Sequence, residues 1–437
     1  MAAPAPGLEG GQAPVTGAVT VTPGPLRPVR LVPPPSKSDA QRALVLSHVL
    51  DQPALRAFAE DGEPRPTDVQ VMAAGLSALR RAASTGEAVE VDCRDGGAPF
   101  RLLLGQAAVT PGARVCFTGT PRLGERPHGA LVQALRDALG PSGLHLEQGN
   151  PWPLSVLGAA QAAPVPVLRV DARGSSQFPS SLLLAAAALV LRERRPWTVS
   201  LAGGLASAGY LELTVHWLRR CGFLVSKGEG RWTVEGHAPP AAWPAVPGDW
   251  SSLGYLLLLA WRSGGRAARV DLQAPHPDRA VVRVLRGLGL RVEVDPQGEA
   301  TVQGRATSGL DADGAECPDL LPTLGALACV LPGPSTLRHV SILRAKESDR
   351  LEALSDLVRA AGGTPVLEGD TLHVVPPEAV RPFAFDARGD HRMAMSAATL
   401  AVLGGVEVEL RAAHGVDKSF PGFFAQLAGL GCAMRGP

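Results

Sequence analysis

One pattern of apolar and polar positions recurs along the chain. An amphipathic helix runs into a glycine, and a short segment typical of a strand follows. Glycine is the usual helix C-cap because it adopts a left-handed φ without a steric penalty. The six glycines at these joints are Gly86, Gly140, Gly222, Gly289, Gly362 and Gly431. Their spacing of roughly seventy residues favours six α/β units, three in each of two domains. Such joints also occur in α/β proteins without a true repeat.

Two proline-rich segments indicate where the chain crosses between domains. One is Val32-Pro33-Pro34-Pro35, and the other runs from Pro239 to Pro247. We therefore predict one domain over residues 35–248 and a discontinuous second domain formed by residues 15–34 and 249–437. Residues 1–14, rich in alanine, proline and glycine, are predicted to be a flexible leader.

Short polar runs precede several predicted helices, where free N–H groups favour an anion. Ser38 and Gln41 have the spacing of a capping box. Arginines also fall in four first turns, where they oppose the helix dipole. These arginines are Arg42, Arg101, Arg350 and Arg392. Each alone could pair with a nearby carboxylate, but together they favour a phosphate or carboxylate ligand held bidentately.

Composition narrows the choice of function. The net charge is +1 and only 4% of residues are aromatic, so a nucleic-acid partner is not expected. The sequence holds neither a Walker loop nor a G-x-S-x-G elbow. Lysine occurs only four times, at Lys37, Lys227, Lys346 and Lys418. Because arginine cannot replace a compact, titratable ammonium, each lysine is a candidate for chemistry, although Lys227 lies in a turn-like segment that suits a surface residue.

The six cysteines and the apolar segments predict a cytoplasmic protein. No pair of cysteines has C-x-x-C spacing, so reduced, mostly buried thiols are expected rather than a zinc or redox site. The N-terminus lacks a secretory pattern, and the apolar stretch over residues 182–191 is too short to cross a bilayer. A membrane partner is therefore not expected.

The polar runs, in their order, resemble those of the 3-phosphoshikimate 1-carboxyvinyltransferase (EPSP synthase) family. The matching runs include PSKSDAQRAL, LGERP, KESDR and DHRMAM, and the matches span residues 35–427. LGERP, KESDR and DHRMAM are specific in combination, although each alone is a weak signal. The resemblance implies an α/β fold, a two-domain inside-out α/β barrel with three βαβαββ units in each domain. It also implies the shikimate pathway of aromatic amino acid and chorismate biosynthesis.

The resemblance also implies the reaction. The 5-hydroxyl oxygen of shikimate 3-phosphate adds to C2 of phosphoenolpyruvate while C3 gains a proton, and the tetrahedral adduct then loses phosphate and a proton. Asp319 would take the hydroxyl proton, Glu347 would protonate C3, and Lys37 and Lys418 would assist as charges or proton carriers. Neither a metal nor an organic cofactor is needed, and a monomer is expected.

The substrate contacts that the resemblance implies come from both predicted domains. Shikimate 3-phosphate would be bound by Lys37, Ser38, Arg42, Ser175, Ser176, Gln177, Ser207, Tyr210, Asp319 and Lys346. Phosphoenolpyruvate would be bound by Lys37, Gly97, Arg126, Gln177, Arg350, Arg392 and Lys418.

Some positions depart from the family pattern. The usual Asn-Ala-Gly-Thr run reads Asp95-Gly96-Gly97-Ala98, Ile342 replaces a frequent asparagine, and Ala208-Gly209 replaces Lys-Pro. We therefore keep a non-catalytic, substrate-binding paralogue as an alternative, and we expect altered sensitivity to the inhibitor glyphosate. The UDP-N-acetylglucosamine enolpyruvyl transferases form a second alternative, but they usually carry a loop cysteine where this chain has Pro121.

Overall fold

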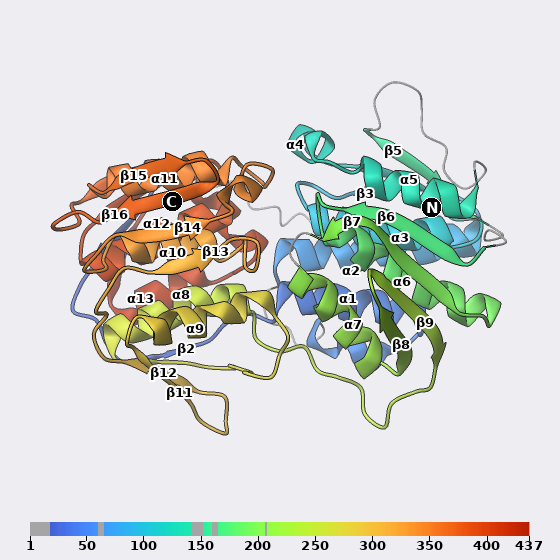
Figure 1. The fold of residues 1–437 in the computed structure, drawn as a ribbon, viewed down its shortest axis with the longest axis horizontal. Helices are drawn as coiled ribbons and strands as arrows, with labels where there is room; N and C mark the ends of the chain where they lie inside the picture. Colours follow the sequence, from blue (N-terminus) through green and yellow to red (C-terminus); the bar gives the residue numbers. More distant parts are fainter. Residues whose placement is uncertain (1–17, 60–64, 141–151, 160–164, 206–207, 437) are drawn as a thin grey trace, which may run out of the picture.

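The computed structural model describes residues 18–59, 65–140, 152–159, 165–205 and 208–436. Figure 1 shows two lobes side by side, one blue to green and the other yellow to red. The first lobe holds residues from α1 (Lys37–Val49) to β9 (Arg231–His237). The second holds α8 (Trp250–Ser263) and the elements after it, and β2 (Arg30–Leu31) runs through it. We call these the N-terminal and C-terminal halves.

Every four-stranded sheet has the same order, a parallel pair followed by two antiparallel strands. In the N-terminal half, the sheet runs β6 (Val167–Ala172), β7 (Trp197–Leu205), β9, β8 (Phe223–Gly228). In the C-terminal half, three sheets follow this rule: β17 (Phe383–Asp386), β18 (Val408–Arg411), β1 (Val19–Pro23), β19 (Cys432–Arg435); β2, β10 (Arg266–Ala267), β12 (Ala300–Gln303), β11 (Arg291–Val294); and β13 (Asp311–Asp313), β14 (Ser335–Arg338), β16 (Thr371–Val375), β15 (Thr364–Glu368).

The first two strands of the described part of the chain, β1 and β2, therefore lie in sheets of the C-terminal half. β1 pairs antiparallel with β18 and β19, and β2 pairs parallel with β10. The chain crosses into the N-terminal half directly after β2 and returns beside the same point. Two hydrogen bonds join the outgoing and returning segments: Ser36 N donates to the Pro247 carbonyl at 2.8 Å, and Asp249 N donates to the Pro34 carbonyl at 3.0 Å.

The glycine-capped helix ends predicted from the sequence are confirmed. All six glycines have positive φ, from 73° at Gly86 to 113° at Gly431. The main helices are α2 (Thr67–Thr85), α3 (Gly97–Val109), α4 (Pro121–Glu125), α5 (Gly129–Leu139), α6 (Gln177–Glu193), α7 (Ala208–Arg220), α9 (Ala280–Gly287), α10 (Leu321–Ala328), α11 (Arg350–Ala360), α12 (His391–Gly404) and α13 (Phe423–Leu430).

The first unit of the N-terminal half differs from the others. Between residues 37 and 86, the described part holds α1, the 3-10 helix η1 (Pro53–Ala59) and α2, without a strand. Gly86 then leads directly into β3 (Ala88–Asp92), which pairs parallel with β4 (Arg114–Thr118) and through it with β5 (Leu154–Leu157). The leader predicted over residues 1–14 lies outside the described residues.

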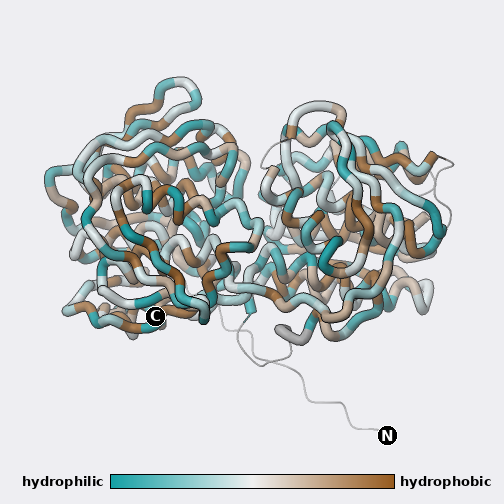
Figure 2. The backbone as a smooth tube through the Cα atoms, turned by 60° about the horizontal axis from the view of Figure 1, so that its bottom comes forward, coloured by the Kyte–Doolittle hydropathy of each residue, from teal (hydrophilic) through white to brown (hydrophobic). Residues whose placement is uncertain are grey.

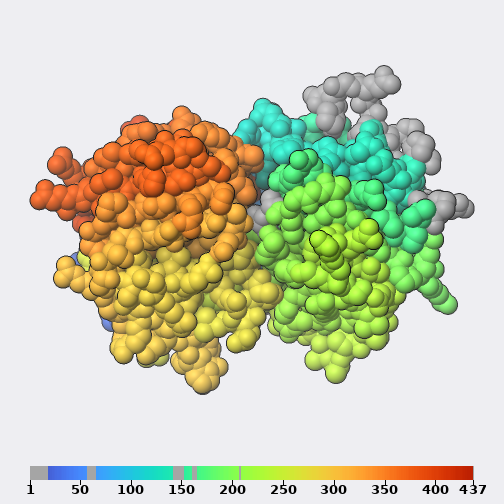
Figure 3. All heavy atoms as spheres, viewed as in Figure 1, coloured from blue at the N-terminus to red at the C-terminus, as the bar shows by residue number. Residues whose placement is uncertain are grey.

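Each half has its own hydrophobic core. One cluster of buried residues runs from Ala40 to Val234, and the other combines Val21 and Leu31 with residues from Trp250 to Cys432. In Figure 2, brown apolar segments are found within both lobes. The apolar run over residues 182–191 is part of α6, and among the described residues there is no helix both long and apolar enough to cross a membrane. Figure 3 shows the two halves meeting along one boundary.

Candidate active site

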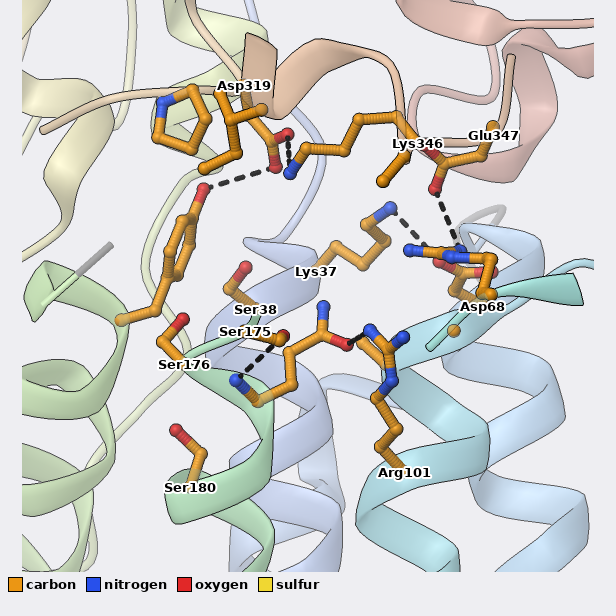
Figure 4. A pocket seen from close by; sticks show the side chains of 18 of the residues that line it. Lys37, Ser38, Asp68, Arg101, Ser175, Ser176, Ser180, Asp319, Lys346 and Glu347 are labelled. Carbon is orange, nitrogen blue, oxygen red and sulfur yellow. Dashed lines mark hydrogen bonds and ion pairs between the residues drawn. The ribbon is translucent and has the colours of Figure 1, made fainter. Parts of the chain in front are cut away.

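A cavity of about 370 Å³ lies where the two halves meet. Figure 4 shows Asp319, Lys346 and Glu347 on one side, facing Lys37, Ser175 and Arg101 on the other. The predicted site residues that line it are Lys37, Ser38, Arg42, Gly97, Arg126, Ser175, Ser176, Gln177, Tyr210, Asp319, Lys346, Glu347, Arg350 and Arg392. Ser207 lies outside the described residues. Lys418 is buried behind Glu347 rather than in the cavity wall.

Helix N-termini bring the hydroxyl groups to this cavity. α1 begins at Lys37 because Ser36 caps it, accepting from Asp39 N at 3.3 Å. The predicted capping box at Ser38 and Gln41 is therefore wrong, because the N-cap lies two residues earlier, at Ser36. Ser38 instead lies in the first turn and lines the cavity. α6 begins at Gln177, whose N–H donates to Ser175 Oγ at 3.2 Å. The first residues of both helices line the cavity, and the positive end of a helix dipole suits anions.

Arg42 and Arg101 lie in the second turns of α1 and α3 rather than in the first turns that the sequence predicted, and both use their donors within the N-terminal half. Arg42 donates to Thr214 Oγ1 at 2.8 Å, to the Ser38 carbonyl at 2.7 Å and to the Tyr210 carbonyl at 2.9 Å. Burial lowers its pKa to about 10. Arg101 likewise donates to neutral groups, among them Gln177 Oε1 at 2.6 Å. These two guanidinium groups therefore brace the cavity wall.

The other two arginines pair with carboxylates of the C-terminal half. Arg350, only 1% exposed, lies 2.7 Å from Asp390, 2.6 Å from Glu347 and 3.3 Å from Asp319. Arg392 Nη2 lies 3.1 Å from Asp319 Oδ2. Charges from these carboxylates outweigh the effect of burial and raise the pKa of both arginines. The simpler interpretation, that a first-turn arginine pairs with a nearby carboxylate, therefore holds for Arg350 and Arg392.

Asp319 is a carboxylate among cations. Besides the two arginines, Lys346 Nζ lies 3.3 Å from it, and Tyr210 Oη donates to it at 3.3 Å. Burial by itself would raise the pKa of Asp319, but Arg392, Lys346 and Arg350 prevail and hold it well below the usual range. The Asp319 carboxylate is thus ionised at neutral pH and able to accept a proton or a hydrogen bond.

Glu347 joins cations from both halves. Its carboxylate lies 3.7 Å from Arg126 Nη1 and 3.4 Å from Lys418 Nζ, in addition to Arg350. Burial opposes ionisation of Glu347, yet Arg350, Lys418 and Arg126 hold its pKa well below the usual range. The carboxylate therefore occupies a position to which an anionic ligand would also be attracted.

Lys418 also links the two halves. Its Nζ lies 2.7 Å from Asp95 Oδ2 on the loop before α3. Burial would lower the pKa of Lys418, but Glu347, Asp68 and Asp95 raise it, so the ammonium stays charged. The carboxylate at position 95, where the resemblance predicts an amide, thus has a lysine partner.

Gly97 allows Arg126 to approach the start of α3. A Cβ added at Gly97 would lie 2.5 Å from Arg126 Nη1. Arg126 is buried, and its Nε and Nη1 have no hydrogen-bond partner among the described residues. A buried guanidinium with unused donors suits an incoming phosphate or carboxylate.

Sequence reasoning missed other residues that line the cavity. Asp68, in the first turn of α2, lies 3.0 Å from Lys37 Nζ. His391, 1% exposed, has no hydrogen-bond partner for either ring nitrogen among the described residues. Burial, with Lys37 and three other cations, places its pKa well below the usual range, so it is neutral. His391 lies inside the DHRMAM run, which could have identified it; Asp68 carried no comparable signal.

The geometry suits two anionic substrates bound side by side. Ionised carboxylates at Asp319 and Glu347 lie among five or more cations in a largely buried cavity, where electrostatic interactions are strong. In the described part of the chain, no group of three or more His, Cys, Asp or Glu side chains is placed to hold a metal ion.

Comparison with known proteins identifies close relatives. The family model for EPSP synthase (3-phosphoshikimate 1-carboxyvinyltransferase) matches residues 29–427. The 3-phosphoshikimate 1-carboxyvinyltransferase of Methanopyrus kandleri is 34% identical, covering 92% of this chain and 96% of that relative. The enzyme of the same name from Halobacterium salinarum is 33% identical, covering 95% of this chain and 99% of its own.

Solved structures share the fold at lower sequence identity. EPSP synthase from Acinetobacter baumannii superposes with a TM-score of 0.72 at 18% identity, covering 96% of this chain and 99% of that one. The enolpyruvyl transferase NikO from Streptomyces tendae gives a TM-score of 0.64 at 17% identity, covering 97% and 99%. At these identities the likeness concerns the fold alone.

Proposed function

The chain belongs to the EPSP synthase (3-phosphoshikimate 1-carboxyvinyltransferase) family, and on that premise we propose how its cavity residues carry out the reaction. The enzyme transfers the enolpyruvyl group of phosphoenolpyruvate to the 5-hydroxyl of shikimate 3-phosphate and releases phosphate, a step of the shikimate pathway. One observation carries the proposal: cations and ionised carboxylates from both halves converge on a single cavity.

Shikimate 3-phosphate is bound mainly by the N-terminal half. The N-termini of α1 and α6 place Ser38, Ser175 and Ser176 at the cavity, where the hydroxyl groups and the positive end of each helix dipole favour the phosphate and carboxylate of this substrate. Lys37 and Lys346 add charge from opposite sides, and Tyr210 orients Asp319. Ser207 is retained in this role. Arg42 acts by holding the start of α1, because its donors already have protein acceptors.

Phosphoenolpyruvate binds where Glu347 now meets Arg126, beside Arg350, Arg392 and Lys418. Its phosphate and carboxylate replace part of the negative charge that Glu347 supplies to these cations. Gly97 leaves room for the substrate next to Arg126, and Gln177 lies between the two substrates. Lys37 contributes to both subsites.

Proton transfer needs an acid and a base at different atoms. Asp319, ionised and hydrogen-bonded to Tyr210, accepts the proton of the 5-hydroxyl as its oxygen attacks C2. Glu347 gives a proton to C3. In the free enzyme, the neighbouring cations keep Glu347 ionised. The negative charge of bound phosphoenolpyruvate pairs with those cations and raises the pKa of Glu347, so that it can carry that proton. The tetrahedral adduct then loses phosphate from C2 and a proton from C3, and that proton returns to Glu347, whose carboxylate Lys418 stabilises between the two steps. No metal or organic cofactor takes part in these steps.

Three further statements belong to this proposal. The two domains comprise residues 35–248 and residues 15–34 with 249–437, which the two separate cores support. The protein acts as a monomer, because every proposed site residue comes from one chain. It works in the cytoplasm, which the six unpaired cysteines support.

The proposal is tested by phosphate release from phosphoenolpyruvate with purified protein. We expect release with shikimate 3-phosphate and none with UDP-N-acetylglucosamine. Release with the nucleotide sugar would instead support the related transferase. Tight binding of shikimate 3-phosphate without release of phosphate would support a non-catalytic paralogue.

A further inference from the structure

Arg101 is a buried arginine whose donors all meet neutral acceptors. It is 3% exposed and is the fifth residue of α3. It donates to Gln177 Oε1 at 2.6 Å, to His128 Nδ1 at 3.2 Å and to the Pro127 carbonyl at 2.9 Å. Burial first, and then the nearby Arg126, lower its pKa to about 9. A buried cation that donates no hydrogen bond to a carboxylate is costly, so its presence here calls for a role in the site.

His128, the N-cap residue of α5, extends this contact to Leu123 in α4, within residues 123–127, which we call the Arg126 loop. Its Nε2 lies 2.7 Å from the Leu123 carbonyl, while its Nδ1 accepts from Arg101. Both bonds require the same neutral tautomer, with the proton on Nε2. Burial, assisted by Arg101, lowers the pKa of His128 to about 3, so the ring is neutral under physiological conditions. The ring also packs edge-on against Phe100, with centroids 4.7 Å apart.

The two carbonyls held in this way lie on either side of Arg126. Leu123 is three residues before it and Pro127 is one residue after it. Arg126 has unpartnered donors among the described residues and approaches Gly97 closely, so a small shift of the loop would displace its guanidinium. Arg101 touches this loop and Gln177 at once.

We propose that Arg101 and His128 are positioning residues that hold the Arg126 loop and Gln177 in one shared geometry, so that the contacts to both substrates are set together. This inference rests on the proposed function. It assigns neither residue a contact with the reacting atoms: each acts through Arg126 or Gln177. His128 supports the loop alone, and Arg101 supports the loop and Gln177.

This difference predicts a split in kinetic constants. In His128→Asn the amide oxygen can still accept from Arg101, but the bond to Leu123 is lost; in His128→Gln the amide nitrogen can still donate to Leu123, but the bond from Arg101 is lost. We expect each to raise the KM for phosphoenolpyruvate about tenfold, because each breaks one buried hydrogen bond. The KM for shikimate 3-phosphate should stay within about twofold of the wild type. His128→Ala, which breaks both bonds, should raise the KM for phosphoenolpyruvate more than either amide variant does.

Arg101→Met should raise both KM values, because it releases Gln177 as well as the loop. His237→Asn is the matched control. His237 also packs against a phenylalanine at 4.7 Å and bonds to a carbonyl at 3.1 Å, but it does not line the cavity. Its KM values should match those of the wild type. The unfolding midpoint of each variant, measured alongside, identifies loss of fold.

Two results would overturn the inference. One is an unchanged KM for phosphoenolpyruvate in both folded amide variants, which would mean that the loop needs no support from His128. The other is an equal rise of both KM values in the His128 variants, which would indicate general loosening. Absence of turnover in the wild type would reject the proposed function instead. In that case calorimetric binding of phosphoenolpyruvate to the same variants still tests the positioning role.

Discussion

The two halves contribute different chemistry to one cavity. The N-terminal half supplies Ser38, Ser175 and Ser176 near helix N-termini, together with Arg42 and Arg101, which donate to neutral groups. Its Lys37 and Arg126 do meet carboxylates. The C-terminal half supplies a dense ionic network in which Asp319 and Glu347 are surrounded by cations. Hydroxyls and backbone N–H groups recognise an anion without competing charges, whereas coupled acids and cations can move protons and stabilise developing charge. We infer that one half mainly orients the acceptor and the other mainly performs the reaction.

The comparison is tested most strongly at Glu347. In Glu347→Gln the amide cannot give a proton to C3, although its size is preserved. We expect kcat to fall by about 10² to 10⁴, while the KM for shikimate 3-phosphate changes little. Stopped-assay measurement of released phosphate gives both constants. Glu352→Gln, which changes an exposed carboxylate in the first turn of α11, is the control. Near-normal kcat in Glu347→Gln would remove this residue from the proton path.

Gly97→Ala affects the point at which the halves meet. The new Cβ would lie 2.5 Å from Arg126 Nη1, so the guanidinium must shift from its present position. Loss of a charged hydrogen bond from the displaced guanidinium to the substrate costs about 2 kcal/mol, which corresponds to roughly a thirtyfold rise in the KM for phosphoenolpyruvate. Gly287→Ala, where a Cβ would meet nothing within 4 Å, is the matched control. An unchanged KM would show that Arg126 does not bind this substrate.

Ser176→Ala should have a smaller effect, confined to the other substrate. Loss of one hydrogen bond to a charged phosphate costs about 1.5 kcal/mol. The KM for shikimate 3-phosphate should rise about tenfold, and that for phosphoenolpyruvate should not. Ser77→Ala, on the exposed face of α2, serves as the reference. If the KM values for both substrates rose together, the inference that the two halves have different roles would be contradicted.

The smallest expected effect concerns stability at low pH. Asp319 and Glu347 have pKa values held well below those of free carboxyl groups by neighbouring cations. Their ion pairs therefore stabilise the fold above the unfolded pKa of about 4, and this stabilisation is lost as the pH falls through the lower folded values.

Asp319→Asn tests whether the ion pairs of Asp319 stabilise the fold at neutral pH and lose this effect on acidification. Its unfolding midpoint, followed by calorimetry from pH 7 down to pH 3, should fall less on acidification than that of the wild type. Asp137→Asn, an exposed carboxylate on α5, should follow the wild-type curve. A steeper fall for Asp319→Asn would contradict the depressed pKa.

The sequence by itself located the glycine-ended helices and most of the residues that line the cavity. A left-handed φ at a helix end strongly favours glycine, so Gly86 and the five similar residues could be located from local pattern alone. The runs around Lys37, Ser175 and Glu347 identified the family because their residue types are fixed by the chemistry they perform.

Only the tertiary structure decided which charges neutralise one another. Arg42, Arg101, Arg350 and Arg392 have similar local sequence positions, yet two donate to neutral groups and two pair with carboxylates. The partners of each lie far away along the chain, and ion pairing depends on distance in space rather than on neighbours in sequence. For the same reason the contacts of His128 with Arg101 and the Arg126 loop could not be inferred before the fold was known.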